Sequence, residues 1–310
     1  MPSLKSKLIR YAMLFEKWCV PDHRSFMASR ARFNGFGERY RPLRGSSVEA
    51  VDIDGIASEW IIPSKPMARR TVIYLHGGGY EVGSCACYRA IVSYFAEAYR
   101  AKTLLIDYGL APEYPFPAGL EDVLSVYHHL LSQRHAPENI VIMGDSAGGG
   151  LTLATLLSLI AQGSHLPSAA VLLSPWTDLT LSGESIQTRA HVEPMLRLGV
   201  IENMARHYCG DHDPRHPLIS PLYADLHGLP PLLIHVGDDE ILLNDSTRLA
   251  EQAQAAGVDV TFKVWPEMWH FFHWAAMHDV AESKQAIAEI AAFVEAHMGQ
   301  PVVRSVETED

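Results

Sequence analysis

The segment VIMGDSAGGG, residues 141–150, decides the fold of this 310-residue chain. Its first half is a short apolar run, and its second half is a run of small residues that opens a helical pattern. Within it, GDSAG (144–148) fits the spacing G-x-S-x-G, in which a serine sits on a sharp turn between a strand and a helix. Because the backbone of such a turn is strained, its neighbours must be nearly without side chains. The segment therefore predicts a strand, a tight turn carrying Ser146, and a helix.

Apolar, strand-like runs alternate with helical stretches on both sides of that turn. The predicted strands are 71–75, 103–107, 139–144, 169–174, 231–236 and 260–265, preceded by a pair of alternating stretches at 47–53 and 57–62. The predicted helices lie near 88–100, 117–134, 147–162, 243–256 and 279–298. Strands that are apolar on both faces and separated by helices indicate a mostly parallel sheet. The predicted fold class is α/β, with a mostly parallel central sheet flanked by helices.

This alternation is interrupted between residues 180 and 225, where the chain is polar, partly helical and rich in proline. An insertion at the edge where the carboxyl ends of the strands open is well placed to cover a site. The N-terminal residues 1–45 are predicted to be helical and then loop-like. Their helical spacing of apolar residues indicates an amphipathic helix.

Charge and cysteine content restrict the function classes. The formal net charge is −11, which argues against nucleic acid or an anionic membrane as the main partner. The N-terminus has no signal-peptide pattern, and no stretch reaches the about 18 apolar residues of a membrane span. The four cysteines are too few for a disulfide scaffold and lack zinc-site spacing. We expect a soluble, cytoplasmic protein with free thiols.

A second glycine-rich stretch, YLHGGGYEVG (74–83), follows the strand predicted at 71–75. Adjacent glycines let the backbone bend so that N–H groups can face a ligand that approaches closely. In enzymes with a serine on a strand-to-helix turn, such a loop and the amide after the serine bind the developing oxyanion. Ala147 supplies that second amide here. Because His76 precedes the serine, we interpret it as structural rather than as a proton carrier.

A nucleophilic serine needs a histidine base and a carboxylate that orients it, and in this fold they follow in the order serine, acid, histidine. GDDEILLND (237–245) follows the strand at 231–236, and PEMWHFFH (266–273) follows the strand at 260–265. His270 is the first histidine of its loop and lies between aromatic residues, which limit the access of water. It is the predicted base.

The sequence resembles the hormone-sensitive-lipase-like α/β-hydrolases, the bacterial family IV carboxylesterases. The matching segments span about residues 70 to 275: HGGGY (76–80), DYGLAPEYPFPA (107–118), GDSAGG (144–149), SPL (220–222), LPPLLIHVGDDEILLND (229–245) and MWHFF (268–272). The resemblance implies the α/β-hydrolase fold, Ser146 as nucleophile and His270 as base. It places Gly78, Gly79 and Ala147 in the oxyanion hole.

The resemblance assigns the triad acid to Asp239, with the adjacent Asp238 as the alternative. It gives Asp245 a structural role. The chain departs from the family pattern at Gly109, because the family commonly has arginine at this position, directly before the segment LAPE (110–113). The loop of Gly109 lies behind the oxyanion loop, so we expect a different support for that loop in this chain.

The resemblance also implies a two-part helical cap over the site. The predicted organisation is an N-terminal part of the cap, a first part of the catalytic domain, the cap insertion, a second part of the catalytic domain and a flexible tail: 1–45, 46–180, 181–225, 226–300 and 301–310. The insertion carries Cys209, Asp211, His212, Asp213 and His216. Their spacing meets no metal motif, and we expect no metal and no cofactor.

The favoured function is a serine carboxylesterase for short-to-medium acyl esters, without interfacial activation. The expected partner is a small-molecule ester, with no nucleic acid and no membrane. An amidase or formamidase could use the same triad, and a non-catalytic binding protein on this fold is the alternative from another class. The strand at 260–265, if it lies at the sheet edge, could pair across a two-fold axis to form a homodimer.

Overall fold

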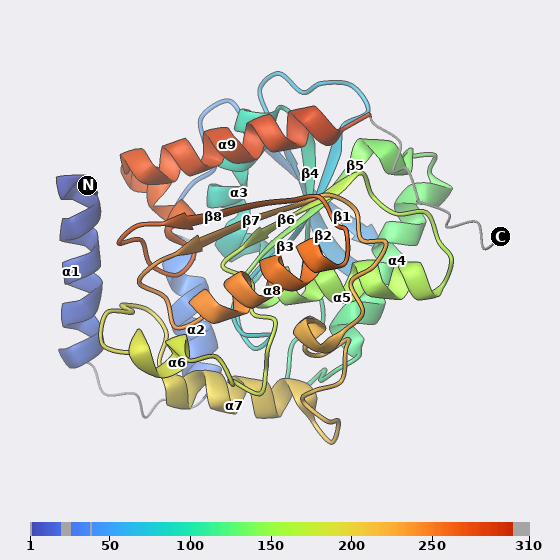
Figure 1. Ribbon diagram of the computed structural model, residues 1–310. Helices are drawn as coiled ribbons and strands as arrows, with labels where there is room; N and C mark the ends of the chain where they lie inside the picture. The colour runs from blue at the N-terminus through green and yellow to red at the C-terminus, as the bar shows by residue number, and fades with distance from the viewer. Residues whose placement is uncertain (1, 20–25, 38, 300–310) are drawn as a thin grey trace.

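The computed structural model describes residues 2–19, 26–37 and 39–299, and the predicted tail at 301–310 lies outside them. Eight strands form its sheet: β1 Ser47–Ile53, β2 Ile56–Ile62, β3 Thr71–Leu75, β4 Lys102–Ile106, β5 Ile140–Asp145, β6 Ala169–Leu173, β7 Leu232–Gly237 and β8 Val260–Trp265. The helices alternate with them (Figure 1): α1 Leu4–Cys19, α2 Phe26–Gly37, α3 Cys85–Tyr99, α4 Ala118–Ser132, α5 Ala147–Ala161, α6 Ser185–Thr188, α7 Leu198–Cys209, α8 Leu243–Ala255 and α9 Ala281–His297. Three short 3₁₀ turns complete the order: Pro137–Asn139, Pro221–Tyr223 and Phe272–His278.

The strands lie in the order β1-β2-β4-β3-β5-β6-β7-β8. β1 and β2 are antiparallel to their neighbours, and the pairs from β4 to β8 are parallel. The predicted fold class is therefore confirmed, and most predicted strands differ from the observed ones by one residue. The strand at 260–265 has its predicted bounds and lies at the sheet edge, where it leaves backbone groups unpaired on one side.

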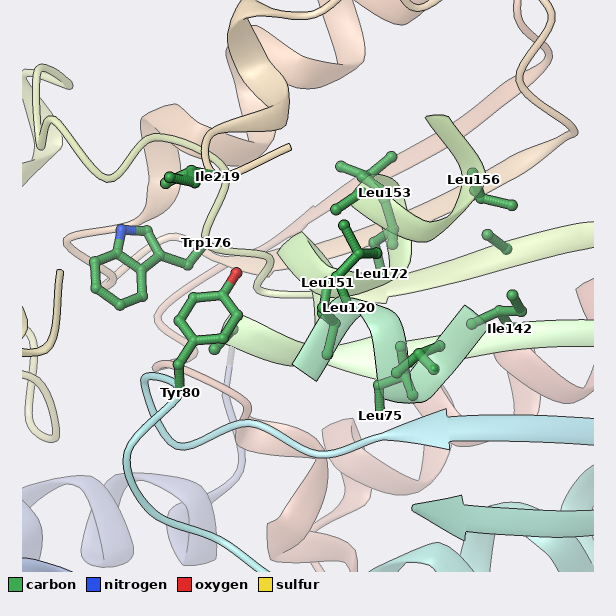
Figure 2. Packing of buried hydrophobic residues seen from close by; sticks show 14 of the residues in the cluster. Leu75, Tyr80, Leu120, Ile142, Leu151, Leu153, Leu156, Leu172, Trp176 and Ile219 are labelled. Carbon is green, nitrogen blue, oxygen red and sulfur yellow. The ribbon is translucent and has the colours of Figure 1, made fainter. Parts of the chain in front are cut away.

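Helices cover both faces of the sheet, as Figure 1 shows, with α3 and α9 on one face and α4, α5 and α8 on the other. Because side chains alternate along a strand, β3 sends Ile73 and Leu75 to one core and Val72 and Tyr74 to the other. Figure 2 shows the first of these cores, where leucines of α5 pack over β3, β5 and β6. Both faces are buried, which explains why these strands are continuous apolar runs.

This topology brings the loops with the predicted site residues to one edge of the sheet. The loops after β3, β5, β7 and β8 all leave the carboxyl ends of parallel strands. In open α/β sheets, ligands bind at this edge. It is also where the insertion between β6 and β7, with α6 and α7, leaves the sheet.

Candidate active site

Ser146 lies in the turn between β5 and α5 and has φ 53° and ψ −121°, a conformation that residues other than glycine rarely adopt. Its neighbours must be small. A Cβ on Gly144 would lie 2.2 Å from the carbonyl oxygen of Gly148, and one on Gly148 would lie 2.0 Å from that of Leu75. The strand, turn and helix predicted around Ser146 are confirmed, and the glycines in GDSAG are required by backbone contacts.

The glycines after β3 also adopt backbone angles that favour glycine, since φ is 115° at Gly78 and 62° at Gly79. A Cβ on Gly78 would lie 2.1 Å from the carbonyl oxygen of Val82. Val82 in turn donates its N–H to the carbonyl oxygen of Gly78 at 3.0 Å, which closes the turn. Any larger residue at 78 would break this turn.

Three backbone N–H groups beside Ser146 remain free to bind an anion. Within the described part of the chain, the N–H groups of Gly78, Gly79 and Ala147 donate no hydrogen bond. β3 and β5 are adjacent, with Leu75 opposite Gly144, so the loops that follow them leave the sheet side by side. The structure thus brings together the residues predicted to form an oxyanion hole. Ala147 also opens α5, whose N-terminus favours negative charge.

Asp145, which the sequence did not single out, joins the two loops. Its carboxylate accepts hydrogen bonds from the Tyr74 hydroxyl at 2.8 Å, the Tyr88 hydroxyl at 3.0 Å and the Gly77 N–H at 3.0 Å. Burial raises the pKa of Asp145 to about 6, although these hydrogen bonds oppose the shift. The side chain before the serine therefore fixes the glycine loop against the turn of Ser146.

His270 lies in the loop after β8 and is held by Glu240. Its Nδ1 lies 2.9 Å from Oε2 of Glu240, whose side chain is fully buried. The other oxygen of Glu240 accepts hydrogen bonds from the Ser174 hydroxyl at 2.6 Å and the Gly237 N–H at 2.5 Å. Ser174 also accepts the N–H of Phe271 at 3.1 Å, which ties the histidine loop to the end of β6. Sequence reasoning found His270 and missed both Glu240 and Ser174.

The predicted pairing of His270 with Asp239 is wrong. Asp239 instead forms an ion pair with Arg10 of α1, at 2.7 Å between Oδ2 and Nη2. The alternative, Asp238, accepts a hydrogen bond from Arg189 at 2.9 Å and is the most exposed of the three acidic residues in this run. Both aspartates thus bind arginines outside the sheet.

The turn after β7 explains why the third acidic residue reaches the histidine. Asp239 donates its N–H to the carbonyl oxygen of Met268 at 2.9 Å, and a Cβ on Gly237 would lie 2.2 Å from the same oxygen. The two loops therefore run in backbone contact. The chain turns sharply after Gly237, and the Glu240 side chain returns to the strand end and to His270.

The charges around His270 raise its pKa above the ordinary value. Burial by itself lowers that pKa, but the hydrogen bond and the charge of Glu240 outweigh it, and the buried carboxyls of Glu193 and Asp145 add to the increase. Glu193 comes from the loop before α7 and accepts the N–H of Ile241 at 3.3 Å. Burial raises the pKa of Glu193 to about 7.

His76 is structural, as predicted. It is fully buried, its ring stacks on that of Tyr108 at 4.5 Å, and its carbonyl oxygen accepts the Tyr108 hydroxyl at 2.6 Å. Burial lowers the pKa of His76. Gly109 follows this tyrosine and donates its N–H to Asp122 at 2.8 Å.

An arginine of α2 supports the oxyanion loop from outside. Arg30 donates from Nε to the carbonyl oxygen of Glu81 at 2.7 Å and from Nη2 to that of Ala111 at 2.9 Å. It also forms an ion pair with Glu113 at 2.8 Å. Arg30 therefore joins the loop after β3 to the loop that contains Gly109. We expected the oxyanion loop to be supported differently from that of the family because Gly109 replaces the usual arginine.

The N-terminal helices and α7 reach the same loops. Tyr208 of α7 stacks on Tyr80 with ring centroids 3.6 Å apart, and a Cβ on Gly79 would lie 2.2 Å from the sulfur of Met204. Ser146 and His270 are only 6% and 4% exposed.

Asp245 has the structural contacts that the resemblance implied. It is buried in α8 and accepts the N–H groups of Thr177 and Asp178 at 2.8 and 2.9 Å. Burial raises its pKa to about 7. Across the residues that the structure describes, no group of three or more metal-ligating side chains is found, and no helix is long and apolar enough to cross a bilayer.

Known proteins are similar to this chain in sequence. Residues 72–274 match the family model described as alpha/beta hydrolase fold. An acetyl-hydrolase from Streptomyces hygroscopicus is 42% identical over 253 residues, which cover 81% of this chain and 84% of that protein. An esterase from Acinetobacter venetianus is 38% identical over 256 residues, which cover 82% of this chain and 80% of that protein.

A solved structure is similar over nearly the whole chain. The crystal structure of an esterase from the bacterial hormone-sensitive lipase family superposes with a TM-score of 0.91 and 38% identity. The match covers 96% of this chain and all of that one.

Proposed function

This chain belongs to the hormone-sensitive-lipase-like esterases of the α/β-hydrolase family, and we propose that it hydrolyses short-to-medium acyl esters through an acyl-enzyme on Ser146. The observation that carries the proposal is the buried hydrogen bond between His270 and Glu240, at the same sheet edge as the strained Ser146 and three free N–H groups. A serine, a base held by a carboxylate, and an oxyanion site are the parts that acyl transfer requires.

In the acylation step, the Ser146 hydroxyl oxygen attacks the ester carbonyl carbon while Nε2 of His270 takes its proton. Glu240 accepts the Nδ1–H, which fixes the tautomer of His270 and stabilises the imidazolium that forms. The carbonyl oxygen becomes an oxyanion and is bound by the N–H groups of Gly78, Gly79 and Ala147. The C–O bond to the alcohol then breaks, and His270 returns the proton to the leaving alkoxide.

In the second step, a water molecule gives its proton to His270 and attacks the acyl carbon. The same N–H groups bind the second oxyanion. The bond between the acyl carbon and the Ser146 oxygen then breaks, His270 returns the proton to that oxygen, and the acid is released. No metal or cofactor takes part in either step. The rigid link from Asp145 to Gly77 keeps the oxyanion loop in place during both steps, so that little reorganisation is needed.

The proposed cap consists of residues 1–45 and 181–225 and limits the size of the acyl group. Support comes from the contacts of α7 with the oxyanion loop and from the low exposure of Ser146. A covered pocket of ordinary size, roughly 300–1,000 Å³, holds a short acyl chain and excludes a long one. We therefore propose acetyl-to-hexanoyl esters as good substrates, with no rate increase at a lipid interface.

An amidase would use the same residues, and the test compares matched substrates. We expect rapid hydrolysis of p-nitrophenyl acetate and butyrate, slow hydrolysis of the palmitate ester, and at most weak hydrolysis of p-nitroacetanilide. Faster turnover of the anilide than of the acetate ester would make the protein an amidase. A maximum at palmitate, or a rate jump when an emulsion forms, would contradict the proposed cap. Failure to hydrolyse any of these compounds would support the non-catalytic alternative.

A further inference from the structure

The residue that follows Glu240 is held by both of its backbone polar groups. The Ile241 N–H donates to Oε2 of Glu193 at 3.3 Å, and the Ile241 carbonyl oxygen accepts the Ser185 hydroxyl at 2.7 Å. The side chains of Ile241, Glu193 and Ser185 are all buried. Both partners of Ile241 belong to the insertion at 181–225, so the insertion binds the backbone directly beside Glu240.

Ser185 is joined to the same turn by two further hydrogen bonds. Its hydroxyl oxygen accepts the N–H of Asn244 at 2.9 Å, and its own N–H donates to Oδ1 of Asn244 at 2.6 Å. A Cβ on Gly183 would lie 2.9 Å from the Cβ of Asn244, so the two segments approach closely. Figure 1 shows α6, which begins at Ser185, beside the start of α8. Ser185 is therefore fixed relative to the turn after β7.

Glu193 is fixed within the insertion as well. Its Oε1 accepts the N–H groups of Met195 and Leu196 at 2.7 and 3.2 Å, and its carbonyl oxygen accepts a hydrogen bond from Lys17 of α1 at 2.5 Å. Among the described residues, no lysine or arginine forms an ion pair with its carboxylate. Burial of such a carboxylate is costly, and an apolar side chain would serve the fold at least as well. Its contact with the turn of Ile241 therefore offers the better explanation for the carboxylate.

We propose that the insertion positions the triad acid, with Ser185 and Glu193 as positioning residues that act through Ile241. Because Glu240 and Ile241 share a peptide group, the two hydrogen bonds fix the direction in which the Glu240 side chain leaves the backbone. Buried hydrogen bonds of this kind are stronger than the same bonds in water. Loss of either bond lets Glu240 move relative to its histidine. This inference rests on the proposed function, because it assigns the two residues to the same triad.

A purely structural role for these contacts is the competing explanation, and the two roles differ in kinetics. If Ser185 and Glu193 only attached the insertion to the sheet, their loss would lower stability and raise KM without changing the chemical step. If they position Glu240, their loss lowers kcat, because a misplacement of about 1 Å caused far from the reacting atoms can cost about 10²-fold.

Kinetics with p-nitrophenyl butyrate separate the two roles. Ser185→Ala and Glu193→Gln should each lower kcat about tenfold or more with little change in KM. Ser220→Ala is the matched control. Ser220 is buried in the same insertion and also donates to a carbonyl oxygen, that of Pro214 at 2.6 Å, and accepts an N–H, that of Leu179 at 2.8 Å. It should retain kcat within about twofold, because these bonds do not reach the turn of Glu240.

A double variant tests whether Ser185 acts through the acid. In a Glu240→Gln background, Ser185→Ala should lower kcat less than about twofold further, because residues that act as a unit are not additive. The same loss factor in both backgrounds would overturn the proposal. It would also be overturned by wild-type kcat in well-folded Ser185→Ala and Glu193→Gln, or by an equal loss in Ser220→Ala.

NMR of the proton on Nδ1 of His270 gives a readout that requires no turnover. Ser185→Ala and Glu193→Gln should shift this resonance upfield or broaden it, and Ser220→Ala should leave it unchanged. Circular dichroism and the urea midpoint report folding, and Glu193→Gln alone carries every comparison if Ser185→Ala does not fold. If the wild type hydrolyses no ester, the proposed function fails, and the resonance still decides this inference. An unchanged resonance in both variants would contradict it.

Discussion

The turn that carries Ser146 follows β5 and the turn that carries Glu240 follows β7, with β6 between these strands, and different physical requirements determine the residues of the two turns. In the first, glycines at 144 and 148 are forced by carbonyl oxygens about 2 Å from a hypothetical Cβ, so the backbone fixes the sequence. In the second, three consecutive acidic side chains follow Gly237, and each binds a different basic side chain: Arg189, Arg10 and His270. Local backbone geometry therefore identifies the serine, whereas tertiary contacts select the acid.

The largest expected effect tests the first turn. Ser146→Ala should fold normally and lose about 10³-fold or more in kcat/KM for p-nitrophenyl butyrate, because only the oxyanion site and binding remain. Circular dichroism and the urea midpoint serve as controls for folding. Activity within tenfold of the wild type in a well-folded variant would remove Ser146 from the mechanism.

The second largest effect on kcat distinguishes Glu240 from Asp239 in the turn after β7. Glu240→Gln should lower kcat about 10²-fold, because an amide donor facing Nδ1 favours the wrong tautomer of His270. Asp239→Asn should retain kcat within about tenfold, since its partner is Arg10 rather than the histidine. The two variants are measured with the same ester at saturation. The opposite ranking would restore Asp239 as the acid and contradict the hydrogen bond to Glu240.

The two ion pairs between arginines and the aspartates of this turn should differ in coupling energy. The Arg10–Asp239 side chains are 14% and 11% exposed, whereas those of Arg189–Asp238 are 36% and 39% exposed. Double-mutant cycles in urea should give about 1–2 kcal/mol of coupling for the first pair, since it is partly desolvated. The more exposed pair should give less than about 1 kcal/mol. Equal coupling energies would show that α1 is not held through Asp239.

The smallest effect is a shift in the pH profile. His270 acts as a base only when neutral, so kcat/KM should fall as the pH drops through its pKa. Because Glu240 raises that pKa, the midpoint of the acidic limb should lie above the ordinary value of about 6.5. In Glu240→Gln the remaining activity should have its midpoint at lower pH. If the midpoint were the same in Glu240→Gln and the wild type, a group other than His270 would control the loss of kcat/KM at low pH.

Much of the molecule could be predicted from the sequence because backbone requirements are local. The order of strands and helices, the turn of Ser146 and the glycine loop follow from apolar runs and glycine positions. Glu240 could not be chosen in this way, since Asp238, Asp239 and Glu240 differ by one position and the partners Arg189, Arg10 and His270 come from distant segments. Asp145, Ser174 and Arg30 also act through contacts between segments, which no local pattern records.

Proton NMR of the histidine Nδ1–H tests most directly whether Glu240 holds His270. A proton in a buried hydrogen bond between a histidine and a carboxylate resonates far downfield of the backbone amides, and the wild-type protein should show it. Asp239→Asn should keep this resonance, and Glu240→Gln should lose it while the rest of the spectrum remains that of a folded protein. A resonance that disappears in Asp239→Asn and persists in Glu240→Gln would contradict the account.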